Sequence, residues 1–248
     1  MGLIVLCAAG FLGRQGAKLV SAAKEGQSAQ HVCEVVIDVG HGGIDSGKVS
    51  ADGILEKDVN LAIAKKLKVL LEQEDVAVTL TRDCDMGLYE ESDSNKKVAD
   101  LQNRCALIEK IEPDCTVSIH QNSYTSPEVK GAQVFYYGQS PEGEALAKLV
   151  QESLVTRVDP DNHRQAKAND TYYLLKRTVS PTIIVECGFL SCPQEAALLT
   201  QDDYQNRLVW AIHMGVMEFL NGNRGADTAR VTAQPAPFAK APAALSRC

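Results

Sequence analysis

Two histidines and two glutamates in this chain have the residue types and positions of a hydrolytic metal site. His41 lies in a glycine turn, Val39-Gly40-His41-Gly42-Gly43, directly after an apolar run, and Glu56, His120 and Glu186 follow. Two imidazoles and one carboxylate can hold a zinc ion and leave a fourth coordination position open for water. A second carboxylate can then act as a general base. This combination predicts a metallohydrolase.

Each of these residues also has a structural interpretation when it is taken alone. His41 is equally well explained as a turn residue that bonds local backbone groups, and His120 as a core histidine with satisfied hydrogen bonds. Glu56 opens a predicted helix, where the helix dipole favours an acidic residue. Glu186 directly follows the apolar run 182–185. A carboxylate at the exit of a buried strand is costly unless it has a partner or a function, so Glu186 is the hardest to explain structurally.

Apolar patterns place these residues among alternating strands and helices. Strands are predicted where β-branched and apolar residues cluster, at residues 33–39, 76–81, 115–119, 132–137 and 182–187. Helices are predicted at residues 55–72, 95–111, 141–157 and 204–220. Nearly continuous apolar strands that alternate with helices predict a single α/β domain, whose largely parallel sheet carries helices on both faces.

The strand ends suggest how residues far apart in sequence form one site. His41, His120 and Glu186 each lie at or just past the C-terminal end of a predicted strand, and Glu56 opens the first helix. Functional groups of open α/β sheets gather beyond the carboxyl ends of the strands. We therefore expect the four residues to converge at one edge of the sheet.

Composition divides the chain into three parts. Residues 1–31 begin with an uncharged apolar run whose length suits a signal sequence better than a membrane span, so we expect a signal or anchor remnant and an exported or anchored, extracytoplasmic protein. Residues 32–221 form the predicted catalytic domain. Residues 222–248 are rich in Ala and Pro and are expected to be disordered. The net charge of −7 disfavours nucleic acid as a partner.

Five short blocks of sequence occur in order within residues 34–221. They are residues 40–47 (GHGGIDSG), 56–61 (EKDVNL), 80–82 (LTR), 118–122 (SIHQN) and 185–191 (VECGFLS). Together they resemble the amidase type 3 family, the zinc-dependent N-acetylmuramoyl-L-alanine amidases of bacterial cell walls. The resemblance implies a twisted, mixed and mostly parallel sheet of about six strands with helices on both faces.

The resemblance also implies roles for individual residues. His41, Glu56 and His120 would bind one zinc ion per chain, and Glu186 would be the catalytic carboxylate. Asp45 and Asn122 are candidates for orienting the zinc ligands, with turn-stabilising contacts as an equal alternative. Arg82 and Arg104 are candidates for contacting peptide carboxylates, but structural ion pairs are the preferred account of both arginines. No residue is assigned to substrate binding.

Within the family, the pair Gly47-Lys48 and residues 164–168 and 172–176 look like the germination-specific amidases of spore-forming bacteria. That likeness implies cleavage of the amide between the lactyl group of N-acetylmuramic acid and L-alanine in spore cortex peptidoglycan. A separate deacetylase would then lead to muramic δ-lactam, and an accessory lipoprotein is a candidate partner. The oligomeric state is not predicted.

Three alternatives to this interpretation stay open. The first is a general cell-wall amidase of growth or division, and the second is an inactive wall-binding relative that has lost its metal. The third is a thiol hydrolase that uses Cys187 with a histidine base. A thiol hydrolase would be inactivated by alkylating agents and indifferent to chelators, which is the reverse of what zinc dependence predicts.

Overall fold

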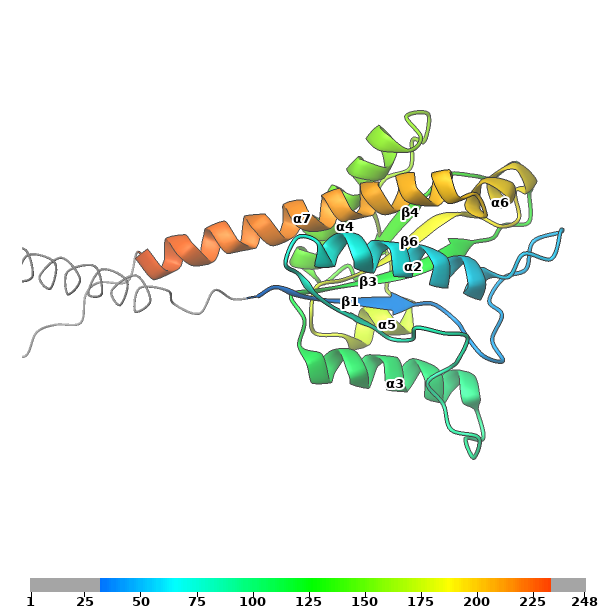
Figure 1. Ribbon diagram of the computed structural model, residues 1–248, viewed down its shortest axis with the longest axis horizontal. Coiled ribbons are helices and arrows are strands. Elements are labelled where there is room, and N and C mark those ends of the chain that lie inside the picture. Colours follow the sequence, from blue (N-terminus) through cyan, green and yellow to red (C-terminus); the bar gives the residue numbers. More distant parts are fainter. Residues whose placement is uncertain (1–31, 233–248) are drawn as a thin grey trace, which may run out of the picture. The chain divides into compact units, whose positions relative to one another are not determined.

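The computed structural model describes residues 32–232 (Figure 1). Residues 1–31, predicted to hold a signal or anchor remnant, and residues 233–248 of the predicted tail lie outside the described residues. No helix within the described part of the chain is long and apolar enough to cross a lipid bilayer.

Six strands form one mixed sheet in the order β2-β1-β3-β6-β4-β5. Their bounds are β1 (Glu34–Val39), β2 (Ala77–Leu80), β3 (Cys115–Asn122), β4 (Gln133–Tyr136), β5 (Lys167–Ala168) and β6 (Thr182–Phe189). Strands β2, β1, β3 and β6 are parallel neighbours, whereas β4 runs antiparallel to β6 and pairs with β5 in parallel. The predicted mixed, mostly parallel sheet of about six strands is confirmed.

Helices cover both faces of this sheet, as predicted (Figure 1). They are α2 (Glu56–Glu72), α3 (Lys96–Ile111), α4 (Pro141–Arg157), α5 (Tyr173–Arg177), α6 (Pro193–Leu199) and α7 (Asp202–Thr232). Helices α2, α4 and α7 pack together on one face, and α3 and α5 lie on the other. The sequence patterns missed β5, α5 and α6, because elements this short show no measurable periodicity.

Alternation along the strands separates the main core from the polar face. Val35, Ile37 and Val39 of β1 belong to the main core with residues of α2, α4 and α7, whereas Val36 packs with Cys105 of α3. Successive side chains of a strand point to opposite faces. The α3 side of the sheet therefore carries the alternate residues of each strand, and near the carboxyl ends these are polar: Asp38 of β1, Ser118 and His120 of β3, and Glu186 of β6.

Three elements extend beyond their predicted ends. Strands β3 and β6 continue beyond their predicted ends at residues 119 and 187, because backbone pairing does not require apolar side chains. His120 therefore lies within its strand and not past its end, whereas Glu186 lies within its strand as predicted. Helix α7 was expected to end at residue 220 but runs to Thr232, so the predicted disordered tail, residues 222–248, begins in a helix. The first proline after residue 220 is Pro235, and no earlier residue forces the helix to stop.

Candidate metal centre

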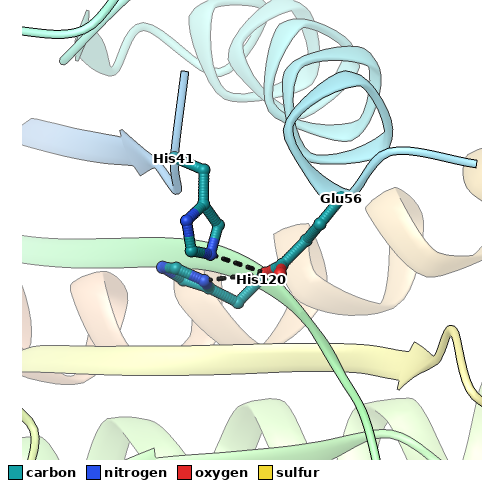
Figure 2. A group of neighbouring side chains, drawn as sticks. All are labelled: His41, Glu56 and His120. Carbon is teal, nitrogen blue, oxygen red and sulfur yellow. Dashed lines mark hydrogen bonds and ion pairs between the residues drawn. The ribbon is translucent and has the colours of Figure 1, made fainter. Parts of the chain in front are cut away.

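The side chains of His41, Glu56 and His120 converge at the carboxyl ends of β1 and β3 (Figure 2). One ligand atom from each residue lies within 4.8 Å of the others. The carboxylate oxygen Oε1 of Glu56 lies 3.1 Å from Nε2 of His41 and 3.0 Å from Nδ1 of His120. The two imidazoles therefore present different ring nitrogens to one point beside the carboxylate.

His41 reaches this point from a strained turn after β1. Its φ angle is 62°, in the left-handed region, which costs a non-glycine residue about 1–2 kcal/mol. Its Nδ1 lies 2.8 Å from Oδ2 of Asp45, so Nδ1 carries the proton and Nε2 keeps its lone pair for a metal. Burial alone would raise the pKa of Asp45, but hydrogen bonds from Lys97 and His41 lower this pKa to about 2. Asp45 is thus a permanent acceptor for His41.

Glu56 is the first residue of α2 and is almost fully buried. Its Oε2 accepts a hydrogen bond from the backbone N–H of Lys48 at 2.7 Å, and Oε1 accepts one from the N–H of Gln121 at 3.0 Å. Burial alone would raise the pKa of Glu56, but the adjacent imidazoles of His120 and His41 hold this pKa well below its usual range. The residue therefore enters the site as a carboxylate.

Two glycines let the ligand side chains approach the backbone closely. A Cβ atom at Gly40 would lie 2.4 Å from the ring of His120. A Cβ atom at Gly47 would lie 2.5 Å from Oε2 of Glu56 and 2.7 Å from Cδ2 of His41, and the φ of Gly47 is 66°. The sequence suggested turn formation for the glycines beside His41, but the contacts of Gly40 and Gly47 become visible only when the strands and α2 are assembled.

Glu186 lies beside this group, because it pairs in register with His120 across β3 and β6. Its Oε1 accepts a hydrogen bond from the hydroxyl of Tyr172 at 3.4 Å, and its buried Oε2 has no hydrogen-bond partner among the described residues. Burial raises the pKa of Glu186 above its usual range. Burial alone would lower the pKa of His120, but Glu56 raises this pKa to about 8.

A pocket of about 240 Å³ opens from these residues toward α3 and α5. His41, His120 and Glu186 lie at its polar end, and five further charged side chains line it, namely Asp38, Asp45, Lys97, Asp100 and Arg104. Its wall carries apolar and aromatic side chains from α3, from α5 and the residue before it, and from β6, namely Leu101, Tyr172, Tyr173, Leu174 and Ile184. A pocket with a polar end and an apolar wall can hold a small organic group against the candidate metal ligands.

The four remaining candidate residues, Asp45, Asn122, Arg82 and Arg104, make different contacts. Asp45 contacts His41 directly, whereas the side chain of Asn122, the last residue of β3, accepts a hydrogen bond from the N–H of the next residue, Ser123. Arg104 forms ion pairs with Asp38 and Asp100. Arg82 donates its hydrogen bonds to backbone carbonyls.

The structure does not support a thiol nucleophile at position 187. The side chain of Cys187 is fully buried in the main core, on the opposite face of β6 from Glu186. Burial raises the pKa of this thiol far above its usual range. A thiol must ionise to act as a nucleophile, so Cys187 is unsuited to that role.

Comparisons with known proteins match the chain over its described domain. The family model Amidase_3, described as N-acetylmuramoyl-L-alanine amidase, matches residues 35–218. The germination-specific N-acetylmuramoyl-L-alanine amidase of Bacillus subtilis (strain 168) is 36% identical over 188 residues, which are 75% of this chain and 78% of that protein.

Solved structures give the same result. The CwlD amidase from Clostridioides difficile, in complex with the GerS lipoprotein, is 39% identical with a TM-score of 0.75, over 77% of this chain and 99% of that one. The N-acetylmuramoyl-L-alanine amidase AmiC2 of Nostoc punctiforme is 36% identical with a TM-score of 0.66, over 76% of this chain and 97% of that one.

Proposed function

Because this chain belongs to the Amidase_3 family of N-acetylmuramoyl-L-alanine amidases, we propose that it binds zinc through His41, Glu56 and His120 and uses Glu186 to hydrolyse its substrate. The bond cleaved is the amide between the lactyl group of N-acetylmuramic acid and L-alanine in peptidoglycan. The family predicted from the five sequence blocks is confirmed.

The donor set of the candidate metal centre fits zinc. Two imidazole nitrogens and one carboxylate oxygen lie around one point, and three protein ligands leave a coordination position open, as in catalytic zinc sites. His41 also has the carboxylate acceptor on its other ring nitrogen that zinc-binding histidines usually have. A zinc ion at this point would polarise the lactyl carbonyl and lower the pKa of water to about 7.

Glu186 is suited to move the proton of the reaction. Its buried Oε2 is free to accept a proton from the attacking water, because only Oε1 is bonded to Tyr172. The raised pKa of Glu186 strengthens it as a base and lets it hold that proton until the departing nitrogen of L-alanine, which is the stronger base, takes it. The chain thus supplies both the base and the acid of the hydrolysis in one side chain.

The observation that carries this proposal is the convergence of His41, Glu56 and His120 around one point, together with the pocket that His41, His120 and Glu186 line. We expect Glu186→Gln to keep one zinc ion per chain and the thermal stability of the wild type. Its turnover of muropeptides should fall about 10²- to 10⁴-fold, the usual contribution of a general base. Zinc content by elemental analysis and release of stem peptides test this, and a wild-type rate would show that Glu186 is not the base.

We extend the proposal to spore cortex peptidoglycan as the substrate. The support is the 36% identity to a germination-specific amidase and the 39% identity to the CwlD amidase. Because cortex is assembled outside the cytoplasm, residues 32–221 would then act as an exported catalytic domain, followed by a deacetylase that leads to muramic δ-lactam. A deletion strain whose cortex kept its normal δ-lactam content would exclude this role.

A lipoprotein is the candidate partner in this proposal, since the CwlD amidase forms a complex with the GerS lipoprotein. Co-purification of the chain with a lipoprotein of its own organism would test the interaction. A general wall role is less favoured, because the probable cell wall amidase LytH of Staphylococcus epidermidis is 28% identical and this chain spans 58% of its length.

A further inference from the structure

Two buried arginines direct their guanidinium groups at one short stretch of backbone, residues 39–41. Arg82 and Arg104 are 3% and 2% exposed. Arg82 comes from the segment after β2 and Arg104 from α3. Both therefore reach the turn that carries His41 from elements far away in sequence.

The carbonyls of these three residues each accept two side-chain hydrogen bonds. The carbonyl of His41 accepts from Arg82 at 2.6 Å and from Arg104 at 2.7 Å. The carbonyl of Val39 accepts from Arg82 at 3.1 Å and from Arg104 at 2.6 Å. The carbonyl of Gly40 accepts from Arg82 and from Asn60 of α2, both at 3.1 Å.

This arrangement brings two like charges together inside the protein. Asp38 and Asp100 compensate Arg104, with hydrogen bonds of 2.8 and 2.6 Å to its guanidinium group. Arg82 has the carbonyls as its direct partners, and burial together with the charge of Arg104 lowers the pKa of Arg82. Fork-shaped guanidinium donors can bond several carbonyls at once, which a lysine ammonium cannot do in the same geometry.

The bonded stretch is the one in which His41 adopts its left-handed backbone conformation. A strained conformation persists only where its surroundings hold it. Here the donors come from three elements and hold the residue whose imidazole lies beside Glu56 and His120. The hydrogen bonds thus act on the direction in which the imidazole of His41 points.

We propose that Arg82 and Arg104 are positioning residues of the metal centre, which fix the backbone of residues 39–41 and thereby determine its affinity for zinc. The inference rests on the proposed function, since it takes His41 as a zinc ligand. Neither arginine belongs to the group of residues whose ligand atoms converge, although Arg104 lines the same pocket. Their effect passes through the carbonyls of the turn to the imidazole.

Arg82→Lys tests this proposal, because it keeps the positive charge but removes the planar guanidinium group that bonds several carbonyls at once. We expect the dissociation constant for zinc, measured by competition with a chelator, to rise about 10- to 100-fold, as for other partners of metal ligands. The matched control is Arg164→Lys, since Arg164 also donates to a backbone carbonyl, that of Lys130, and stacks on Phe189. The control should bind zinc as the wild type does.

A double-mutant cycle shows whether the effect passes through His41. In a His41→Ala background, Arg82→Lys should cause no further loss of zinc affinity. An equal loss of zinc affinity in both backgrounds would overturn the proposal. The proposal would also be overturned if the Arg82→Lys protein unfolded at a lower temperature without zinc but bound zinc like the wild type.

A milder variant keeps the test valid if Arg82→Lys does not fold. Asp100→Asn removes the charge that orients Arg104 and should weaken zinc binding in the same direction by a smaller factor; unchanged affinity would overturn the proposal. Failure of the proposed function looks different, because wild-type protein would then not bind zinc through His41 at all, and His41→Ala would leave binding unaltered.

Discussion

Each of the three candidate ligands is held by a hydrogen bond or a close contact on the side away from the metal point. His41 is bonded to Asp45, Glu56 accepts the N–H of Lys48, and the ring of His120 lies against Gly40. Such contacts fix the ring and carboxylate orientations before a metal arrives, which lowers the entropic cost of binding. At the scale of residues, the three candidate ligands are therefore preorganised for metal binding.

Proton competition at His120 gives a pH dependence of zinc binding. The pKa of His120 is raised to about 8 by Glu56, and a protonated imidazole cannot bind a metal. We therefore expect deprotonation of His120 to raise zinc affinity about tenfold per pH unit below pH ~8. Above that pH His120 is already neutral, so its deprotonation should add no further affinity. Chelator competition between pH 6 and 9 measures this, and an affinity independent of pH below 8 would contradict the assignment of His120.

At the scale of elements, the turn after β1 packs so closely on β3 that glycine is required at position 40. We expect Gly40→Ala to displace the ring of His120, to weaken zinc binding at least tenfold and to cost about 1–3 kcal/mol of stability through overpacking. Zinc titration and thermal unfolding measure the two effects.

The matched control is Gly222→Ala in α7, where a Cβ atom would meet nothing within 4 Å. This change should leave zinc binding unaltered and stabilise the helix by up to about 1 kcal/mol. Equal zinc affinity in the two variants would mean that Gly40 does not support the site.

The elements also show what the sequence could and could not predict. Apolar runs predicted the five longer strands, because a strand covered on both faces must be apolar. They did not predict that β4 runs antiparallel to β6, since strand direction depends on the connections and not on side-chain pattern. The end of α7 was missed because local composition suggested disorder, although no residue before Pro235 excludes a helix.

Some features of the candidate site could likewise be predicted from the sequence, and others could not. Four chemically distinctive residues, His41, Glu56, His120 and Glu186, were predicted from type, strand position and family resemblance, and the structure brings them together. The carbonyl contacts of Arg82 were not predicted. They depend on the distance between elements, which no local pattern encodes.

At the scale of the whole molecule, zinc would join three elements that are distant in sequence, namely the turn after β1, the start of α2 and the end of β3. A ligand that binds only the folded state stabilises it by about 2.7 kcal/mol at a concentration of 100 times its dissociation constant. For a domain of this size we expect the unfolding temperature to rise by about 5–10 °C.

Differential scanning calorimetry with and without zinc measures this rise. Glu186→Gln should show the full rise, because Glu186 is not a proposed ligand, whereas His41→Ala should lose most of it. A rise that survives His41→Ala would place the bound zinc elsewhere on the chain.

The central claim, zinc-dependent amide hydrolysis at His41, Glu56 and His120, is tested most directly by metal removal and return. Stem-peptide release from purified muropeptides is measured for the protein as purified, after chelation, and after titration with zinc. We predict that chelation abolishes release and that one equivalent of zinc per chain restores it, with alkylation of thiols having no effect. Full release by the chelated, metal-free protein would contradict this account.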